Sequence, residues 1–301
     1  MEYRQLYNAF KTIAGLLRNN HVIDLGSDTN ERNTSNDVKK NIDLLANDTI
    51  VSSLKNIDSI IGYISEEEEE LVIFEKKKHC KNGTVIIFDP LDGSKNVMSN
   101  ISIGTIYGIY NYDVENDRIL DIIETGYGLY GPSTQLVRTV NNEKVVLYDL
   151  GQDNEFHEVK TLSKPTDNSI YSINMSYEYE KDVEYFIHRM KQDGCTQRWC
   201  GAMVADAHQV IMRGGTFIYP SSTKMNKGKI RFLYEALPLS YLFTLLNCVA
   251  VDMNIMPILN KISFIKLNDC DIHGETPIIL TTYYKKKELS NIFELNDLIK
   301  C

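Results

Sequence analysis

The segment Phe88-Asp89-Pro90-Leu91-Asp92-Gly93-Ser94 closes the apolar run 85–88 and is the most informative part of the sequence. A short apolar run of β-branched and aromatic residues predicts a buried strand. Pro90 disfavours the helical region for Asp89, so Asp89 is expected to stay extended at the end of that strand. Gly93 permits a turn directly after Asp92, and a helix can begin there. The two carboxylates are therefore expected to converge beside the backbone N–H groups of a turn or helix start.

Such an arrangement suits two kinds of ligand, because carboxylates bind divalent cations and exposed N–H groups bind phosphate. An Asp-rich surface turn is the alternative, since Asp-Pro and Asp-Gly pairs are common in turns. Two further acidic pairs favour the metal site. Asp37 and Asp43 lie at the exit of a polar loop and on the helix expected after it, and Glu66 and Glu67 follow an expected strand end. The rest of that acidic run, residues 68–70, is expected to be solvated surface.

Composition limits the class of protein. The chain has 301 residues with 32 basic and 41 acidic side chains, a formal charge of −9, which argues against a nucleic-acid binder held by phosphate contacts. The most apolar stretch, 236–251, is interrupted by polar residues and falls short of the ~20 residues of a membrane-spanning helix. No secretory signal is recognisable, and the six cysteines lack paired spacing, so we expect a reducing, cytoplasmic location without zinc or disulfides.

The pattern along the chain predicts two α/β domains that meet in the polar segment 151–169: an N-terminal domain over 1–165 with most metal ligands, and a C-terminal domain over 166–301. Residues 26–36 are predicted to be an exposed loop. We expect helices near 6–17 and over 37–61, 182–191, 203–213 and 237–248, and strands over 61–64, 85–88, 101–110, 119–130, 216–219 and 229–234. In the last strand, alternation places Lys229, Arg231, Leu233 and Glu235 on one face.

Several longer motifs identify a family. SEEE (65–68), FDPLDGSKN (88–96), SIGTIYGIY (102–110), MVADAHQVIMRGGTFIYP (203–220) and GKIRFLYE (228–235) occur in this order. Together they resemble the fructose-1,6-bisphosphatases, which belong to the lithium-sensitive, magnesium-dependent sugar phosphatases. The resemblance extends from about residue 5 to residue 285. It implies the α/β (α+β) sugar phosphatase fold, layered αβαβα with two mixed sheets.

The resemblance also implies which residues bind metal and activate water. The implied metal ligands are Glu66, Asp89, Asp92, Glu235 and the carbonyl of Leu91, together with Asp37 at the loop-borne metal and water site of the family. Asp43 and Glu67 match the carboxylates that polarise the attacking water. The implied cofactor is Mg²⁺, with Mn²⁺ as a substitute, at about two or three ions per site. Hydrolysis of a phosphate ester needs a hydroxide held in line and a neutralised leaving oxygen, and metal ions supply both.

The substrate-binding residues that the resemblance implies are Gly93, Ser94, Lys95, Asn174, Tyr177, Arg198, Trp199, Tyr219, Lys229 and Arg231. Arg198 matches a residue that the family donates across a subunit interface, which implies a homodimer or homotetramer. Among the positions that depart from the family pattern, two bear on phosphate binding. Trp199 replaces a tyrosine whose hydroxyl contacts phosphate, and an indole N–H can still donate there. Lys95 replaces a serine, and we expect its charge to tighten binding of the scissile phosphate.

The resemblance predicts Mg²⁺-dependent hydrolysis of the 1-phosphate of fructose 1,6-bisphosphate to fructose 6-phosphate, a reaction of gluconeogenesis. Sedoheptulose-1,7-bisphosphatase and a broader sugar or inositol phosphatase are alternatives of the same class. A catalytically silent regulatory or scaffold relative is an alternative of another class. The presence of every expected carboxylate argues against the silent relative.

Overall fold

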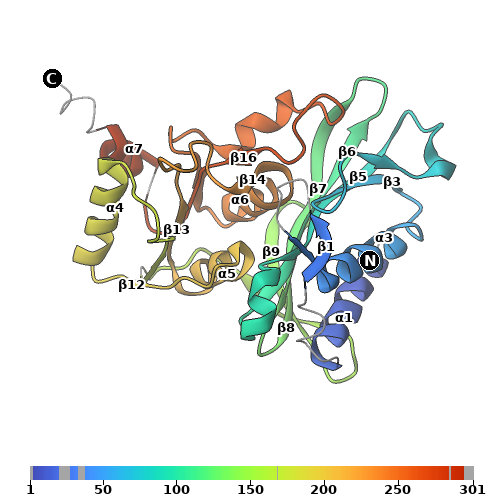
Figure 1. Ribbon diagram of the computed structural model, residues 1–301, viewed down its shortest axis with the longest axis horizontal. Coiled ribbons are helices and arrows are strands. Elements are labelled where there is room, and N and C mark those ends of the chain that lie inside the picture. Colours follow the sequence, from blue (N-terminus) through green and yellow to red (C-terminus); the bar gives the residue numbers. More distant parts are fainter. Residues whose placement is uncertain (1–2, 20–27, 33–37, 168, 285, 295–301) are drawn as a thin grey trace.

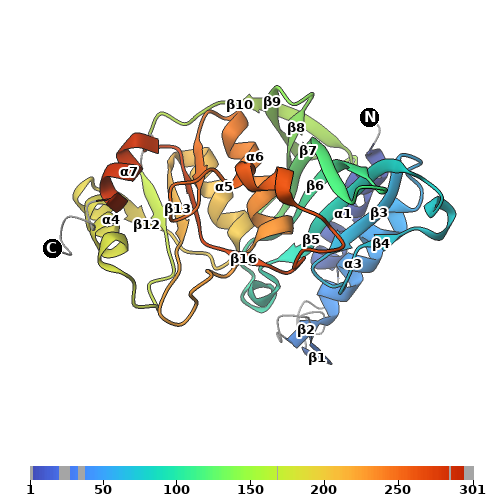
Figure 2. The same cartoon turned by 90° about the horizontal axis from the view of Figure 1, so that it is seen from above.

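The computed structural model describes residues 3–19, 28–32, 38–167, 169–284 and 286–294. Its main elements form five layers (Figures 1 and 2). Helices α1 (Arg4–Asn19) and α3 (Asn41–Leu54) cover one sheet, α5 (Met203–Arg213) and α6 (Leu237–Leu245) lie between two sheets, and α4 (Lys181–Gln192) and α7 (Lys286–Glu294) cover the second. The predicted αβαβα layering is confirmed.

Both large sheets are mixed, as predicted. The first has eight strands in the order β10 (Phe156–Leu162), β9 (Lys144–Leu150), β8 (Thr134–Val140), β7 (Arg118–Tyr130), β6 (Ile103–Asp113), β5 (Asn82–Asp92), β3 (Ile60–Ser65) and β4 (Val72–Ile73). Only β3 and β5 are parallel neighbours in this sheet. The second has the order β12 (Thr196–Gln197), β11 (Ile170–Ser172), β13 (Gly215–Tyr219), β17 (Ile278–Thr281) and β15 (Val249–Val251). The predicted domain boundary at residue 165 lies in the connection from β10 to β11, and it stays a prediction.

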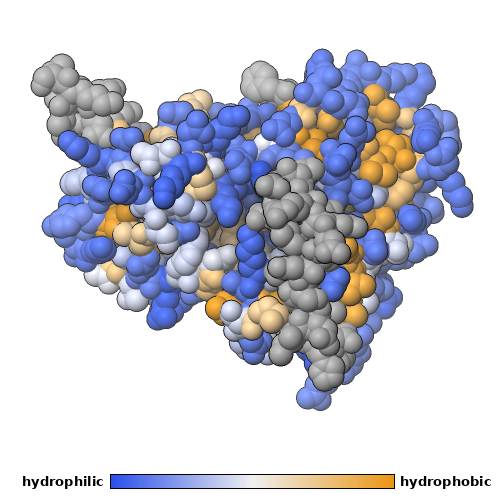
Figure 3. Space-filling model, in the orientation of Figure 1, coloured by the Kyte–Doolittle hydropathy of each residue, from blue (hydrophilic) through white to orange (hydrophobic). Residues whose placement is uncertain are grey.

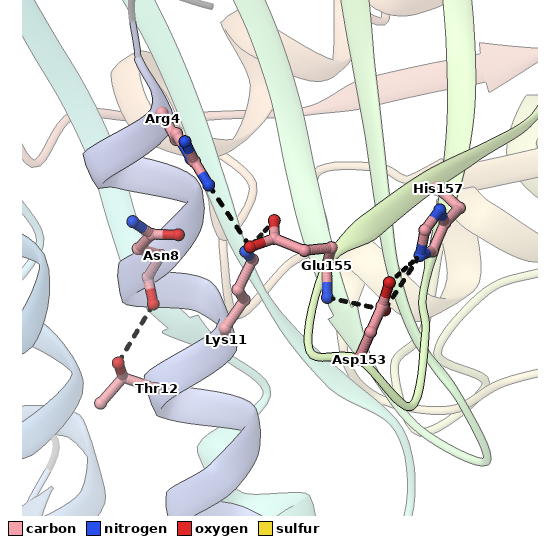
Figure 4. A network of polar contacts seen from close by, with 7 residues as sticks. All are labelled: Arg4, Asn8, Lys11, Thr12, Asp153, Glu155 and His157. Carbon is pink, nitrogen blue, oxygen red and sulfur yellow. Dashed lines mark hydrogen bonds and ion pairs between the residues drawn. The ribbon is translucent and has the colours of Figure 1, made fainter.

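Helix α1 packs on the first sheet through the apolar face that its sequence predicts. Leu6, Phe10 and Ile13 are buried, as three- and four-residue spacing requires of one helical face. The Phe10 ring lies 5.6 Å from the ring of Tyr107 on β6. Ion pairs also hold the helix (Figure 4). Arg4 and Lys11 both bind the Glu155 carboxylate, at 3.4 Å and 2.6 Å. The helix is therefore fixed to the turn between β9 and β10 as well as to the sheet.

A buried ion pair lies under α1. Arg138 on β8 donates to Glu124 on β7 at 2.7 Å, and both side chains are more than nine-tenths buried. The Glu124 carboxylate also accepts the hydroxyls of Tyr7 and Tyr107, and the guanidinium stacks over the rings of Tyr7 and Tyr148. Because α1 supplies Tyr7, the pair joins the helix to the middle of the sheet.

Replacing Arg138 with Met is expected to lower the free energy of unfolding by about 3–5 kcal/mol, because it leaves the Glu124 charge buried and uncompensated. Adding Glu124→Gln should recover much of this loss, since the amide is neutral and its oxygen still accepts from a tyrosine hydroxyl. Urea denaturation of the wild type, the single variant and the double variant measures both effects. A loss below about 1 kcal/mol in Arg138→Met would contradict the stabilising role of the pair.

Three sequence predictions are wrong in their bounds. The expected helix 37–61 is shorter, since α3 begins at Asn41 after strand β2 (Val38–Lys40). The expected loop 26–36 contains strand β1 (Asp28–Arg32), which pairs with β2 despite its polar composition. Helix α6 ends at Leu245, and Asn247 then adopts a left-handed conformation with φ of 56°. The pairing of β1 with β2 and the left-handed residue after α6 set these bounds, and composition shows neither.

The expected strand 229–234 is also wrong. Only β14 (Ile230–Arg231) is extended, where it pairs with β16 (Glu275–Thr276), and a π-helical turn over Phe232–Ala236 then leads into α6. Leu233, Tyr234 and Leu237 are all buried in one cluster, and this is a helical spacing rather than a strand alternation. Lys229, Arg231, Leu233 and Glu235 consequently do not share one strand face.

Hydrophilic side chains cover most of the face shown in Figure 3, and the hydrophobic ones gather mainly over its right-hand part. Every helix among the described residues is too short or too polar to traverse a lipid bilayer.

Candidate active site

A cavity of about 410 Å³ opens where the ends of β3 and β5 meet the start of α5 and the π-helical turn. It draws its walls from both halves of the chain. The lining residues are Asp43, Glu66, Glu67, Asp89, Leu91, Asp92, Gly93, Ser94, Lys95, Asn96, Asn174, Trp199, Gly201, Met203, Phe217, Tyr219, Lys229, Ile230 and Glu235.

Strand β5 carries the first two carboxylates of the cavity. Asp89 lies in extended backbone at the end of the strand, as Pro90 predicts, and the Leu91 N–H donates to its Oδ1 at 2.8 Å. The Thr105 hydroxyl on β6 donates to the Pro90 carbonyl at 2.8 Å, so the bend is fixed to the neighbouring strand. The two aspartates of the motif therefore face one cavity, as the sequence predicts.

A third carboxylate reaches the same point from the C-terminal half. Glu235 lies on the π-helical turn, and its Oε2 accepts the backbone N–H of Arg231. One carboxylate oxygen each of Asp89, Asp92 and Glu235 lie within 4.8 Å of one another, and all three residues are buried. Glu66, after β3, lies close enough to Asp89 for the charges of the two carboxylates to interact. Acidic residues from three distant segments thus form one cluster.

Mutual repulsion and burial perturb the titration of this cluster. Burial, then the charges of Glu66, Asp92 and Glu235, hold the pKa of Asp89 well above its usual range. Burial also raises the pKa of Asp92 to about 7 and, with the charges of Glu67 and Asp43, the pKa of Glu66 to about 8. A divalent cation offsets such repulsion, and carboxylate oxygens are ligands that hard divalent cations prefer. The cluster therefore fits a metal ion.

The turn after β3 is anchored to α3. The Ser65 hydroxyl donates to Asn47 Oδ1 on α3 at 2.7 Å, and the Glu67 N–H donates to the same serine oxygen at 3.2 Å. Asp43, on the first turn of α3, lines the cavity beside Glu67. The anchor places Asp43 and Glu67 near the acidic cluster, and their predicted role in activating water stays a prediction.

His273 ties two parts of this wall together. Its Nε2 lies 2.9 Å from the Glu68 carbonyl oxygen, which can only accept, so Nε2 carries the proton. Nδ1 then accepts the Tyr234 hydroxyl at 3.0 Å. Burial lowers the pKa of His273, which favours this neutral form. The turn that bears Glu66 is thereby joined to the turn that bears Glu235.

Gly93 lets the turn after β5 lie close to Ala202, the residue before α5. Its φ of 81° is left-handed, and a Cβ there would lie only 2.3 Å from the Ala202 Cβ. The next residues, Ser94–Ser99, form a 3₁₀ helix, so the turn predicted after Asp92 is confirmed. Asp92 Oδ2 accepts the Val204 N–H at 2.6 Å, in the first turn of α5. A carboxylate of the acidic cluster thus also caps the helix across the cavity.

The opposite wall is polar and aromatic. Asn174, Trp199, Tyr219 and Lys229 line it, as the substrate prediction requires. The Trp199 and Tyr219 rings are 5.9 Å apart, and Asn174 and Tyr177 lie close enough to the Tyr219 hydroxyl to influence its pKa. Tyr177 reaches the cavity only through Tyr219, since it is not a lining residue.

Two further predicted residues lie outside the cavity wall. Arg198 is exposed and lies outside the cavity wall. Arg231 is not part of the wall either, because its guanidinium donates to the His273 carbonyl at 2.8 Å and pairs with Glu275 at 3.2 Å. Asp37 lies outside the described residues. Sequence reasoning missed the lining residues Asn96, Gly201, Met203, Phe217 and Ile230, although all except Gly201 lie within the quoted motifs.

Two family models together match most of the chain. Residues 3–159 match the model described as fructose-1-6-bisphosphatase, N-terminal domain, and residues 164–281 match the model of its C-terminal domain. The chain belongs to the fructose-1,6-bisphosphatase family. The resemblance inferred from the motifs is thereby confirmed.

Similar members of the fructose-1,6-bisphosphatase family come from diverse organisms. The class 1 enzyme of Sulfurihydrogenibium sp. is 31% identical, with 95% of this chain and 89% of that protein covered. Fructose-1,6-bisphosphatase 1 of Bos taurus is 32% identical, with 97% and 90% covered. The crystal structure of Leishmania major fructose-1,6-bisphosphatase in holo form has a TM-score of 0.85 at 28% identity, covering 97% of this chain and 92% of that one. The fold of the family therefore extends over nearly the whole chain.

Proposed function

We propose that this protein hydrolyses the 1-phosphate of fructose 1,6-bisphosphate, giving fructose 6-phosphate and inorganic phosphate, as a step of gluconeogenesis. One observation carries the proposal: a single cavity combines a buried acidic cluster on one wall with Asn174, Tyr219 and Lys229 on the other. The first wall suits metal-assisted attack on a phosphate, and the second suits a sugar and its other phosphate. Family membership selects the substrate.

The acidic cluster would hold Mg²⁺, or Mn²⁺ in its place, at about two or three ions per site. The ligands would be Glu66, Asp89, Asp92, Glu235 and the Leu91 carbonyl, with Asp37 as a further ligand. When bound, the metal supplies Lewis-acid stabilisation of the developing negative charge. These oxygens are hard ligands, which favours Mg²⁺ or Mn²⁺ over zinc.

The remaining carboxylates would handle the attacking water. Asp43 and Glu67 line the cavity next to the cluster, so either can orient the water and accept its proton. Gly93, Ser94 and Lys95 follow Asp92 and would bind the scissile phosphate, where backbone N–H groups of a turn suit an anion. Arg231 would support this phosphate through its positive charge, which already opposes part of the rise in the pKa of Glu66.

The opposite wall would bind the sugar and the distal phosphate. Lys229 supplies a positive charge, Asn174 and Tyr219 supply polar groups, and Tyr177 lies close to Tyr219. The Trp199 indole N–H would donate in place of a hydroxyl. Arg198 is exposed, and we propose that it reaches the site of a neighbouring subunit in a cytoplasmic homodimer or homotetramer. Sedimentation of the wild type and of Arg198→Ala, with activity measured on both, tests this contribution.

The experiment for the activity is phosphate release from fructose 1,6-bisphosphate, sedoheptulose 1,7-bisphosphate and an inositol monophosphate, each with Mg²⁺ and with EDTA. We expect Mg²⁺-dependent turnover with a clear preference for fructose 1,6-bisphosphate. Preference for another of the three substrates would reassign the sugar. Absence of metal-dependent turnover with all three would favour the silent relative and overturn the proposal.

Replacing Lys95 with Ser is expected to raise KM about three- to tenfold and to weaken inhibition by inorganic phosphate by a similar factor, because a positive charge near the scissile phosphate is lost. Lys95 lines the cavity, whereas the exposed Lys76 lies outside its wall and provides a matched Lys→Ser control. Initial rates at varied substrate and phosphate concentrations measure both constants. If both were unchanged, Lys95 would have no part in binding phosphate.

A further inference from the structure

The Asp206 carboxylate is fully buried in the first turns of α5 and does not line the cavity. Its Oδ1 accepts the Ser172 hydroxyl at 2.9 Å and the Cys200 N–H at 3.0 Å. Its Oδ2 accepts the Gly201 N–H at 3.1 Å and lies 3.2 Å from the Cys200 N–H. A buried carboxylate that accepts hydrogen bonds at both oxygens holds the donor groups firmly in place, because charge-assisted hydrogen bonds are roughly twice as strong as neutral ones.

The donors come from the two segments that build the substrate wall. Ser172 is the last residue of β11, and Asn174 follows two residues later at the cavity. Cys200 and Gly201 directly follow Trp199, which also lines the cavity. Asp206 therefore sets the position of one segment relative to the other.

The turn at 200–201 is shaped for this carboxylate. Gly201 has a φ of 78°, and two successive N–H groups point at one acceptor, an arrangement that binds anions. The Cys200 carbonyl accepts the side-chain amide of Asn96 at 2.8 Å. Asn96 follows Lys95 on the metal side of the cavity, so the turn is held from both walls.

We propose that Asp206 is a positioning residue for the sugar and distal-phosphate subsite of the proposed bisphosphatase. It holds Asn174 and Trp199 at the spacing that the bisphosphate needs, while the acidic cluster keeps its own anchors at Leu91, Thr105 and Val204. This inference rests on the proposed function. It assigns Asp206 a role in substrate affinity and none in attack on the phosphate.

Asp206→Asn tests the role, because the amide keeps the shape but turns one acceptor into a donor that faces backbone N–H groups. We expect KM for fructose 1,6-bisphosphate to rise about tenfold, kcat to stay within about twofold, and the half-saturating Mg²⁺ concentration to stay unchanged. Hydrolysis of p-nitrophenyl phosphate, which has no second phosphate, should stay at the wild-type rate. Asp182→Asn, at the start of α4, is the matched control and should leave every constant unchanged.

Two further variants keep the test informative if Asp206→Asn folds poorly, as judged by its thermal transition. Ser172→Ala removes only the link to β11 and should raise KM about two- to threefold. Gly201→Ala leaves the carboxylate intact but strains the left-handed turn, and it should raise KM in the same selective way.

Different results would contradict the positioning role of Asp206 and the proposed hydrolysis of fructose 1,6-bisphosphate. Equal losses on both substrates, or an unchanged KM for the bisphosphate in all three variants, would overturn the positioning role. Wild-type protein that releases phosphate from p-nitrophenyl phosphate but not from fructose 1,6-bisphosphate would overturn the proposed function instead.

Discussion

Glu235→Gln is expected to lower Mg²⁺-dependent phosphate release from fructose 1,6-bisphosphate by about a thousandfold, since a bound metal contributes several kcal/mol of transition-state stabilisation. Glu235 is the carboxylate that the C-terminal half contributes to a cluster otherwise built from Asp89, Asp92 and Glu66. The amide keeps the volume of the side chain but removes its charge. We expect the variant to fold, because a neutral group in this position also removes a source of repulsion.

The control is Glu70→Gln, which makes the same change at the exposed end of the acidic run that begins with Glu66. It should leave kcat and KM at wild-type values. Rates measured over a wide range of Mg²⁺ concentrations separate weaker metal binding from a lower kcat. If Glu235→Gln kept more than about a tenth of the activity at saturating Mg²⁺, Glu235 would not be a metal ligand.

The placement of Asp89 and Asp92 at the cavity could be predicted because local rules determine the backbone around them. Pro90 and Gly93 dictate an extended residue and then a turn, so the places of Asp89 and Asp92 followed from backbone chemistry. Glu235 was assigned through the family resemblance, while the strand predicted around it was wrong. Alternation from Lys229 to Glu235 indicated a strand, but burial of Leu233, Tyr234 and Leu237 on one side imposed a helical turn.

The hydrogen bonds and ion pairs between residues far apart in the chain could not be predicted in this way. Asp206 and His273 act through partners that are far away in the chain: Ser172 for the first and Glu68 for the second. Nothing in the spacing of a buried Asp or a loop His indicates which backbone group it will meet. The position of Arg231 was missed for the same reason, because its partner Glu275 comes from a strand that pairs only in the folded chain.

The metal-free protein is expected to lose stability as the pH rises from about 5 to about 8, the reverse of simple acid denaturation. Carboxyl groups in an unfolded chain titrate near pH 4. In the folded protein, burial and neighbouring charges raise the pKa of Asp92 to about 7 and of Glu66 to about 8, and hold that of Asp89 higher than usual. The stability that the neutral forms contribute is complete below the unfolded pKa and is lost as pH rises through these folded values.

Thermal unfolding in EDTA should therefore show Tm falling by about 5–10 °C between pH 5 and pH 8, since a few kcal/mol of repulsion shifts Tm by that amount in a chain of this size. Mg²⁺ should remove most of the fall by binding the ionised cluster. Asp89→Asn should raise the metal-free Tm at pH 8 and flatten the pH profile, whereas Asp58→Asn, at an exposed position, should do neither. A wild-type Tm in EDTA that stayed level or rose over this range would show that ionising these carboxylates does not destabilise the folded protein.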